Sequence, residues 1–207
     1  LYGKKIKRNI LAKKAIHIEQ NVMNEKCGSQ DQIWASYGGL NSIRFFKNNF
    51  KVKDLNISKL KSKKICDNLF LIYTGINKLS HIVEKDKISK LDKNIPTLEK
   101  VYNLALEFEY QIRNNNDLSF IGSILNEYWH IKKTLSKKVS NKKIDEIYNL
   151  ALESGASGGK IIGSGGGGFL LVYCKKKFHK NLKKKFSKLP IVKFDFVNEG
   201  SEIIFKS

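Results

Sequence analysis

The sequence predicts an α+β fold. Two apolar runs, Asn68–Gly75 and Phe169–Cys174, are typical of buried strands. Several segments with helical periodicity lie before, between and after these runs, and strands and helices do not alternate strictly as they would in a parallel βαβ sheet. With 207 residues, the chain can form one large domain or two small ones.

The first third of the chain contains two predicted helices and a short strand. Lys7–Asn24 has its apolar residues on one side of a helix. After a turn at Gly28, Asp31 is in a position to cap a second helix, which Gly38-Gly39 would end. A strand is expected at Ile43–Phe46. The segment Lys47–Lys64 is polar and basic, so we interpret it as a loop or hairpin and as the best candidate for a domain boundary.

The rest of the chain alternates between helical and strand-like patterns. Pro96 suits the first turn of a helix over Ile95–Asn115, and Ser140 or Asn141 suits the cap of a helix over Lys142–Glu153. Pro190 would end a lysine-rich helix. The other expected elements are helices at Leu118–Leu135 and Lys175–Leu189, strands at Val192–Val197 and Glu202–Phe205, and a hairpin turn at Asn198–Ser201.

Glycine is concentrated in one segment. Eight of the 15 glycines lie between Gly155 and Gly168, directly before the second apolar run. Glycine loses backbone entropy on folding and buries no side chain, so this density needs a reason. Close approach of backbone N–H groups to a phosphate is one reason. A tight turn between packed elements is the alternative, although a single turn needs only one or two glycines.

Composition narrows the possible classes of protein. The formal net charge is +20, but only Arg8, Arg44 and Arg113 among the 39 basic residues are arginine. Bidentate contacts to phosphates favour arginine, so we interpret most lysines as a solvated surface rather than a nucleic-acid interface. No apolar stretch is long enough to span a membrane. Three widely spaced cysteines, Cys27, Cys66 and Cys174, fit reduced thiols in the cytoplasm.

Two carboxylates are candidates for chemistry. Asp31 follows a glycine turn, where a carboxylate can meet a ligand and can take the proton of an acceptor hydroxyl. The alternative is that Asp31 only caps a helix. Glu19 lies twelve residues earlier, and a pair of carboxylates can hold Mg²⁺ together with nucleotide phosphates. On its own, Glu19 is best explained as a solvated helix residue.

Taken together, several segments resemble the GHMP small-molecule kinases. They include Leu11–Gln20, the sequence Gly28-Ser-Gln-Asp-Gln32, Tyr73-Thr-Gly75 and Gly155–Phe169. Closest is the branch of sugar kinases that act on heptose 7-phosphate, which Trp129–Lys133 and Val197–Ser201 also resemble. The resemblance extends over nearly the whole chain, in order.

The resemblance implies a two-domain ATP- and Mg²⁺-dependent kinase that phosphorylates the anomeric hydroxyl of a sugar phosphate. Residues 1–50 would be the remainder of an N-terminal ATP-binding domain that resembles ribosomal protein S5 domain 2. Residues 51–67 would be a linker or hairpin, and residues 68–207 a ferredoxin-like C-terminal domain. Expected partners are ATP and the sugar phosphate, with no membrane and no specific nucleic acid.

The same resemblance assigns roles to individual residues. Asp31 corresponds to the catalytic base and Glu19 to the carboxylate that holds Mg²⁺. The glycine loop would lie near the phosphates. The implied substrate contacts are Gly28, Ser29, Gln30, Thr74 and Lys78, and the implied loop residues are Gly163, Ser164, Gly165, Gly166, Gly167 and Gly168.

The chain also departs from the family pattern. The Gly/Ser-rich segment that grips ATP is not present in these 207 residues, and Leu1–Lys5 resembles the sequence that follows it. Lys78 stands near the usual place of an arginine, and Ser164 replaces an alanine. We therefore expect the C-terminal part of a kinase, inactive on its own. The alternatives are a basic binding module without catalysis and a degenerate kinase fragment.

Overall fold

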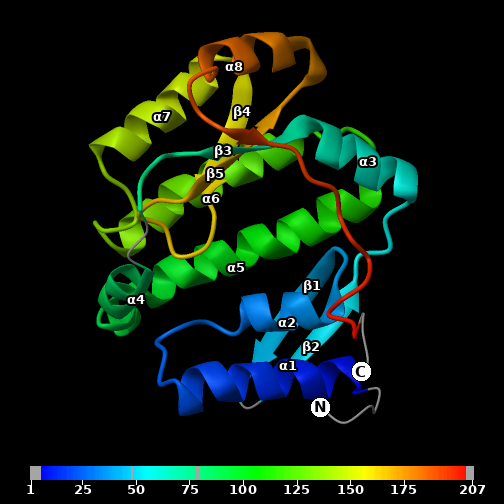
Figure 1. Cartoon of the computed structure of the whole chain (residues 1–207), viewed down its shortest axis with the longest axis vertical. Coiled ribbons are helices and arrows are strands. Elements are labelled where there is room, and N and C mark those ends of the chain that lie inside the picture. The colour runs from blue at the N-terminus through cyan, green and yellow to red at the C-terminus, as the bar shows by residue number, and fades with distance from the viewer. Residues whose placement is uncertain (1–5, 48, 78–79, 204–207) are drawn as a thin grey trace. The chain divides into compact units, whose positions relative to one another are not determined.

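A computed structural model describes residues 6–47, 49–77 and 80–203 (Figure 1). The chain forms two compact units. Unit 1 consists of Leu1–Asn56 and Phe196–Ser207, and unit 2 consists of Ile57–Asp195. Within the described ranges, no helix is both long and apolar enough to cross a membrane.

The described part of unit 1 contains two packed helices and a β-hairpin. Helix α1 continues directly into a single π-helical turn, η1. The two elements together confirm the first predicted helix. The strands pair antiparallel, with Asn41 opposite Asp54. The elements are α1 (Arg8–His17), η1 (Ile18–Val22), α2 (Gln30–Tyr37), β1 (Asn41–Phe46) and β2 (Asn49–Asp54).

The predicted C-terminal hairpin is wrong. Residues 193–203 form no strand, and residues 204–205 lie outside the described residues. Instead, the segment lies against α2. The N–H of Gly39 donates to the carbonyl of Val197 at 2.7 Å, and the N–H of Ser201 donates to the carbonyl of Ala35 at 2.8 Å. A Cβ on Gly200 would collide with a carbonyl oxygen of α2, so the absence of a side chain permits this contact.

Unit 2 is built on a four-stranded sheet with the strand order β4-β5-β3-β6. All neighbouring strands are antiparallel. Along the chain the order is strand, helices, two strands, helix, strand, which is the βαββαβ arrangement of a ferredoxin-like domain. Both predicted buried strands are confirmed. The strands are β3 (Leu69–Tyr73), β4 (Ala156–Ile161), β5 (Phe169–Cys174) and β6 (Ile191–Val192).

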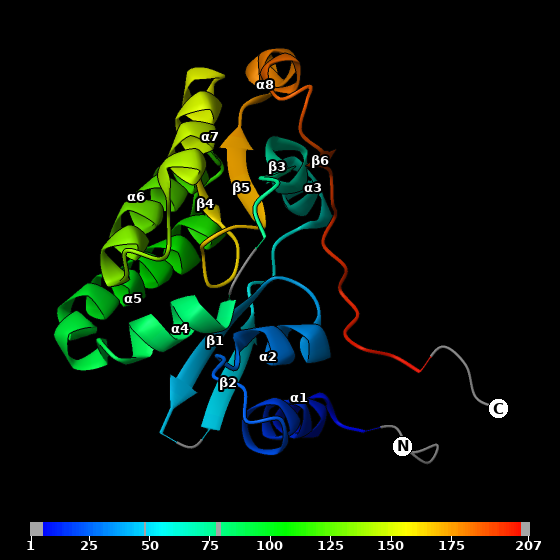
Figure 2. The same ribbon diagram turned by 60° about the vertical axis from the view of Figure 1, so that its left-hand side comes forward.

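Helices α6 and α7 pack against the sheet, and α5 packs against α6 (Figures 1 and 2). Trp129 of α6 and Ile144 of α7 are fully buried in the core with Phe70 of β3 and Val172 of β5. The helices of unit 2 are α3 (Lys59–Asn68), α4 (Ser80–Ile88), α5 (Leu91–Asn114), α6 (Phe120–Leu135), α7 (Lys142–Glu153), the 3₁₀ turn η2 (Lys176–Phe178) and α8 (His179–Lys185).

The helix boundaries confirm some predictions and correct others. Asn141 caps α7, because its Oδ1 accepts the N–H of Ile144 at 3.0 Å. Pro96 is not in a first turn, since α5 begins five residues earlier at Leu91. The predicted helix over residues 175–189 is shorter and is split into η2 and α8. Residues 51–67, which were expected to form a linker or hairpin, contain the rest of β2 and most of helix α3.

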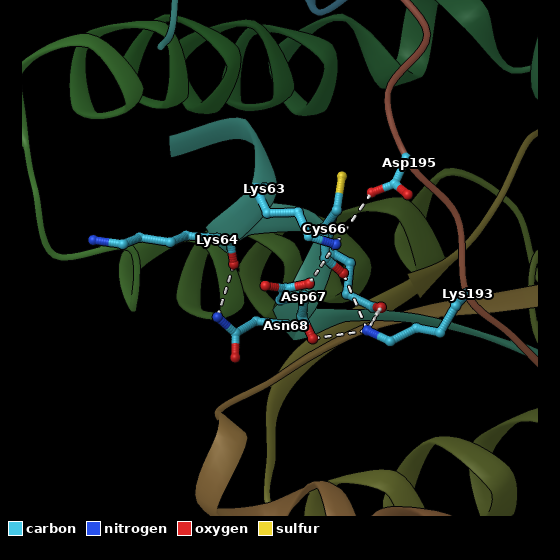
Figure 3. Close-up of polar contacts among 8 residues, drawn as sticks. Lys63, Lys64, Cys66, Asp67, Asn68, Lys193 and Asp195 are labelled. Atoms are coloured by element: carbon cyan, nitrogen blue, oxygen red, sulfur yellow. Dashed lines mark hydrogen bonds and ion pairs between the residues drawn. The ribbon is translucent and has the colours of Figure 1, made fainter. Parts of the chain in front are cut away.

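Lys193, directly after β6, forms hydrogen bonds to the end of α3 (Figure 3). Its Nζ donates to the carbonyls of Cys66, Asp67 and Leu69 at 3.1, 2.7 and 3.0 Å, and it lies 3.8 Å from the ring centroid of Phe70. Desolvation lowers the pKa of the Lys193 amino group. The last carbonyls of a helix have no partner within the helix, so an amino group at this place satisfies them.

Replacing Lys193 with methionine should lower the free energy of unfolding of unit 2 by about 1–3 kcal/mol, because three carbonyls lose their hydrogen bond to a charged amino group while the apolar stem is kept. Urea denaturation followed by circular dichroism measures the change. Lys64→Met is the matched control, since this lysine lies on α3 with an exposed side chain. Equal stability of the two variants would contradict a capping role for Lys193.

Candidate active site

Glu19 lies in the π-helical turn of unit 1. The turn is closed by the N–H of Met23, which donates to the carbonyl of Ile18 at 2.8 Å. Insertion of one residue into a helical turn changes the direction of the side chains that follow, and such turns occur often at functional sites. The Glu19 carboxylate is half-buried and directed towards α2.

A polar network holds this carboxylate. The Nε2 of Gln32 donates to Oε2 of Glu19 at 2.5 Å, and the Cys27 thiol donates to the same oxygen at 3.4 Å. Burial, with the hydrogen bond to Glu19, raises the pKa of Cys27, which keeps the thiol protonated and able to donate. The Oε1 of Gln32 is buried and has no partner among the described residues. Glu19 is therefore a positioned carboxylate rather than a solvated helix residue.

Asp31 occupies the first turn of α2 and is exposed. The prediction that Asp31 caps the helix is wrong, because the N-cap residue is Ser29 and Asp31 is the second helical residue. A carboxylate in this turn is stabilised by the partial positive charge of the helix N-terminus. Because Asp31 is next to Gln32, the network places the Asp31 turn of α2 beside the Glu19 turn.

The other expected substrate contacts of unit 1 surround this turn. Gly28 has open space around it, since a Cβ added at this position would meet nothing within 4 Å. The Ser29 hydroxyl accepts from Nε2 of Gln20 at 3.1 Å, and Gln30 begins α2. Gln20 also donates to the carbonyl of Cys27 at 2.9 Å, so it fixes the turn from the side of η1.

The glycine-rich segment of unit 2 divides into two parts. Its first part forms strand β4, where Gly158 meets Gly122 of α6 so closely that no Cβ fits between their backbones. Here the glycines lie in a strand, so close packing against a helix accounts for them rather than the expected tight turn. The second part, residues 162–168, is the loop between β4 and β5, and Gly163 and Gly165 through Gly168 all have positive φ.

The loop is anchored to two other segments of unit 2. The N–H of Gly166 donates to the carbonyl of Val139 at 2.8 Å, and the N–H of Gly168 donates to the carbonyl of Ile76 at 3.1 Å. Thr74 is fully buried, and its N–H and Oγ1 donate to the carbonyl of Gly168 at 2.9 and 2.8 Å. Thr74, expected as a substrate contact, therefore acts here as an anchor of the loop.

These bonds limit which loop donors remain for an anion. The N–H groups of Gly166 and Gly168 are already paired with protein carbonyls. No acceptor for the N–H of Gly163, Ser164, Gly165 or Gly167 occurs in residues 6–47, 49–77 and 80–203. The Ser164 hydroxyl is 7% exposed and lies 3.3 Å from the carbonyl of Gly165.

Lys132 approaches the loop from α6, the helix that covers β4. Its side chain is buried, with the residue 3% exposed. The Nζ donates to the carbonyl of Ile161 at 3.3 Å and to the carbonyl of Gly163. It also lies 5.8 Å from the ring centroid of Tyr128. Lys78, the other expected lysine, lies outside the described residues.

Comparison with known proteins finds similarity to one class of kinases. The family model described as GHMP kinases C terminal matches residues 92–188. The D-glycero-alpha-D-manno-heptose 7-phosphate kinase of Campylobacter jejuni is 29% identical over 200 residues, which cover 92% of this chain and 57% of that protein. The chain therefore spans little more than half the length of this curated relative.

Solved structures show the same fold. A D-glycero-D-manno-heptose 1-phosphate kinase from Bacteroides thetaiotaomicron superimposes with a TM-score of 0.69 at 20% identity, over 91% of this chain and 52% of that one. The mevalonate kinase of Methanococcus jannaschii gives a TM-score of 0.69 at 21% identity, over 95% and 59%. The fold is thus the α+β fold of the GHMP kinases.

Residues 92–188 thus match the family model of the GHMP kinase C-terminal domain, and the predicted resemblance is confirmed. Two residues of the site that the sequence analysis did not predict lie within motifs that it used. Gln32 lies inside the Gly28–Gln32 motif, and Lys132 lies inside Trp129–Lys133, which carried part of the resemblance. Cys27 precedes the first of these motifs and gives no recognisable signal.

Gly165→Ala should lower the free energy of unfolding of unit 2 by more than Gly75→Ala. Both glycines have positive φ, at +105° and +67°. An alanine held in the left-handed region costs about 1–2 kcal/mol of conformational energy. A Cβ on Gly165 would in addition lie 2.9 Å from the carbonyl oxygen of Val139, whereas Gly75 has nothing within 4 Å. Thermal and urea denaturation of both variants measure the difference, and equal losses would show that the loop moves freely away from Val139.

Proposed function

We propose that this chain is the C-terminal part of an ATP-dependent sugar kinase that phosphorylates the anomeric hydroxyl of heptose 7-phosphate. The observation that carries the proposal is the network of Glu19, Cys27 and Gln32, which holds one carboxylate beside the helical turn that presents the other, Asp31. The likeness to a heptose 7-phosphate kinase over 92% of the chain supports the substrate class.

In this proposal Asp31 is the catalytic base. Its exposed carboxylate lies in the first turn of α2, where it can meet the anomeric hydroxyl and accept its proton. The hydroxyl oxygen then forms a bond to the γ-phosphorus of ATP as the bond to the β,γ-bridging oxygen breaks, and ADP leaves. Phosphoryl transfer depends mainly on such positioning and on stabilisation of the phosphate charge.

The residues around Glu19 fit Mg²⁺. This ion prefers one or two carboxylates together with phosphate oxygens. The bonds from Gln32 and Cys27 both end on Oε2 of Glu19, which leaves Oε1 of Glu19 for the ion. The buried Oε1 of Gln32 is a second oxygen close by. When bound, the ion would neutralise charge on the nucleotide phosphates. Gln32 and Cys27 hold the carboxylate in one orientation for that role.

The glycine loop is proposed to contact a phosphate group. Four of its N–H groups have no acceptor in the described part of the chain, and N–H groups gathered in a glycine-rich turn bind anions. Gly28, Ser29, Gln30 and Lys78 are proposed as further substrate contacts.

The domain assignment follows the family. We propose that residues 1–50 correspond to the remainder of the ATP-binding domain, residues 51–67 to a connection, and residues 68–207 to the C-terminal domain. Residues 196–203 depart from this assignment, because they pack on α2 and form part of unit 1. A cytoplasmic location is proposed because Cys27, Cys66 and Cys174 form no disulfide in the described structure.

Asp31→Asn in the complete open reading frame that contains these residues should lower kcat for heptose 7-phosphate by about 10²- to 10⁴-fold, because the base is lost while the helix is kept. Product formation is followed by coupled release of ADP. Asp92→Asn is the matched control, since Asp92 is also the second residue of a helix. Full activity of the Asp31 variant would exclude the base assignment.

The 207 residues alone should show negligible turnover of ATP, because they contain no Gly/Ser-rich segment resembling the ATP-binding loop. Turnover that Asp31→Asn abolishes would contradict this expectation. The second candidate function, a basic binding module, is favoured only by the net charge of +20. A shift of random DNA that disappears at moderate salt would show generic attraction to lysine and no dedicated function.

A further inference from the structure

We propose that Lys132 is a positioning residue that turns the Ser164 N–H towards a bound phosphate. This inference rests on the proposed function of the glycine loop and deepens it by naming the donor. Lys132 differs from the lysines of the solvated surface, because its side chain is buried under the loop.

The first step is the direction of the Gly163 carbonyl. The Nζ of Lys132 donates to this oxygen, which fixes the carbonyl towards α6. In a trans peptide the C=O and the following N–H point in opposite directions within one plane. The N–H of Ser164 is therefore held pointing away from Lys132.

The peptide between Ile161 and Ile162, two positions earlier, is oriented in the same way. Lys132 also donates to the carbonyl of Ile161 at 3.3 Å. The next N–H, that of Ile162, points the opposite way and donates to the carbonyl of Phe169 at 3.0 Å. One amino group thus orients two peptides, of which the first completes the pairing of β4 with β5 and the second lies in the loop.

The second step is the missing acceptor. Ser164 is 7% exposed, so its N–H is largely removed from solvent. A buried N–H without an acceptor loses several kcal/mol of hydration in an apolar environment, and most such groups are paired. No acceptor for it is found in residues 6–47, 49–77 and 80–203. A phosphate oxygen would supply one.

The third step is the rigidity of the loop on either side. Beyond Ser164, the N–H of Gly166 is fixed on Val139 and the carbonyl of Gly168 on Thr74. Lys132 is the matching attachment at the beginning of the loop. Without it, the peptide between Gly163 and Ser164 can rotate, because glycine adopts positive and negative φ with equal ease.

The test is a titration of the 207-residue chain, labelled with ¹⁵N, with inorganic pyrophosphate at constant ionic strength. We expect a saturable change in the amide resonance of Ser164. Lys132→Met should weaken this binding at least tenfold. Lys133→Met should leave it within twofold. This control removes the same charge from the neighbouring residue, whose amino group pairs with Asp145 at 3.2 Å and not with the loop. Lys132→Arg, which keeps N–H donors, should restore part of the affinity.

The outcomes separate the two proposals. If no loop amide responds to pyrophosphate in the wild-type chain, the phosphate role of the loop fails, and the inference fails with it. If the loop responds but Lys132→Met binds as tightly as the wild type, only the inference fails. Should the methionine variant not fold, the wild-type titration decides, because saturable shifts at Gly163, Gly165 or Gly167 without one at Ser164 would overturn the inference.

Discussion

The conformation of the glycine loop depends on hydrogen bonds that reach it from three separate segments of unit 2. Lys132 comes from α6, Thr74 from the end of β3, and Val139 from the turn before α7. A run of glycines has no side chains that could fix its own backbone. The shape of the loop is therefore set by the surrounding sheet and helices, and it forms only when they are in place.

The same dependence explains the glycines of β4. Helix α6 can deliver Lys132 to the loop only because it lies against β4 at backbone distance, where Gly122 meets Gly158. The glycine-rich segment thus serves two needs in sequence: close packing in the strand and conformational freedom in the loop. Glycine density alone does not distinguish these needs, so the sequence analysis offered a phosphate contact or a tight turn for the segment as a whole.

Much of the fold could be predicted because some local patterns leave no choice. Continuous apolar runs identified β3 and β5, and Asn141 identified the start of α7. The predictions failed where distant contacts decide. The segment after β6 has the alternation of a strand, but its backbone bonds go to α2, which no local pattern reveals. Helix α3 is rich in lysine, so its buried Ile65 and Cys66 gave too weak a signal.

The charged residues of the candidate site could be predicted from the sequence. The residues that hold them in position could not. Glu19 and Asp31 are recognised by motif. Gln32, Cys27 and Lys132 act through hydrogen bonds to other groups, and such partners appear only when the chain is folded. Similarity to known kinases does not supply these contacts, because a sequence comparison aligns residues by position and not by the bonds they form.

The return of the C-terminal segment to α2 has a consequence for how the molecule is made. Ser201 and Ala35 are separated by 166 residues, yet they are bonded in unit 1. On the ribosome, where chains emerge from the N-terminus, α2 is made 166 residues before Ser201, the partner of Ala35. Unit 2 is continuous and can complete its contacts earlier. Unit 1 is therefore the first unit to be synthesised and the last to be finished.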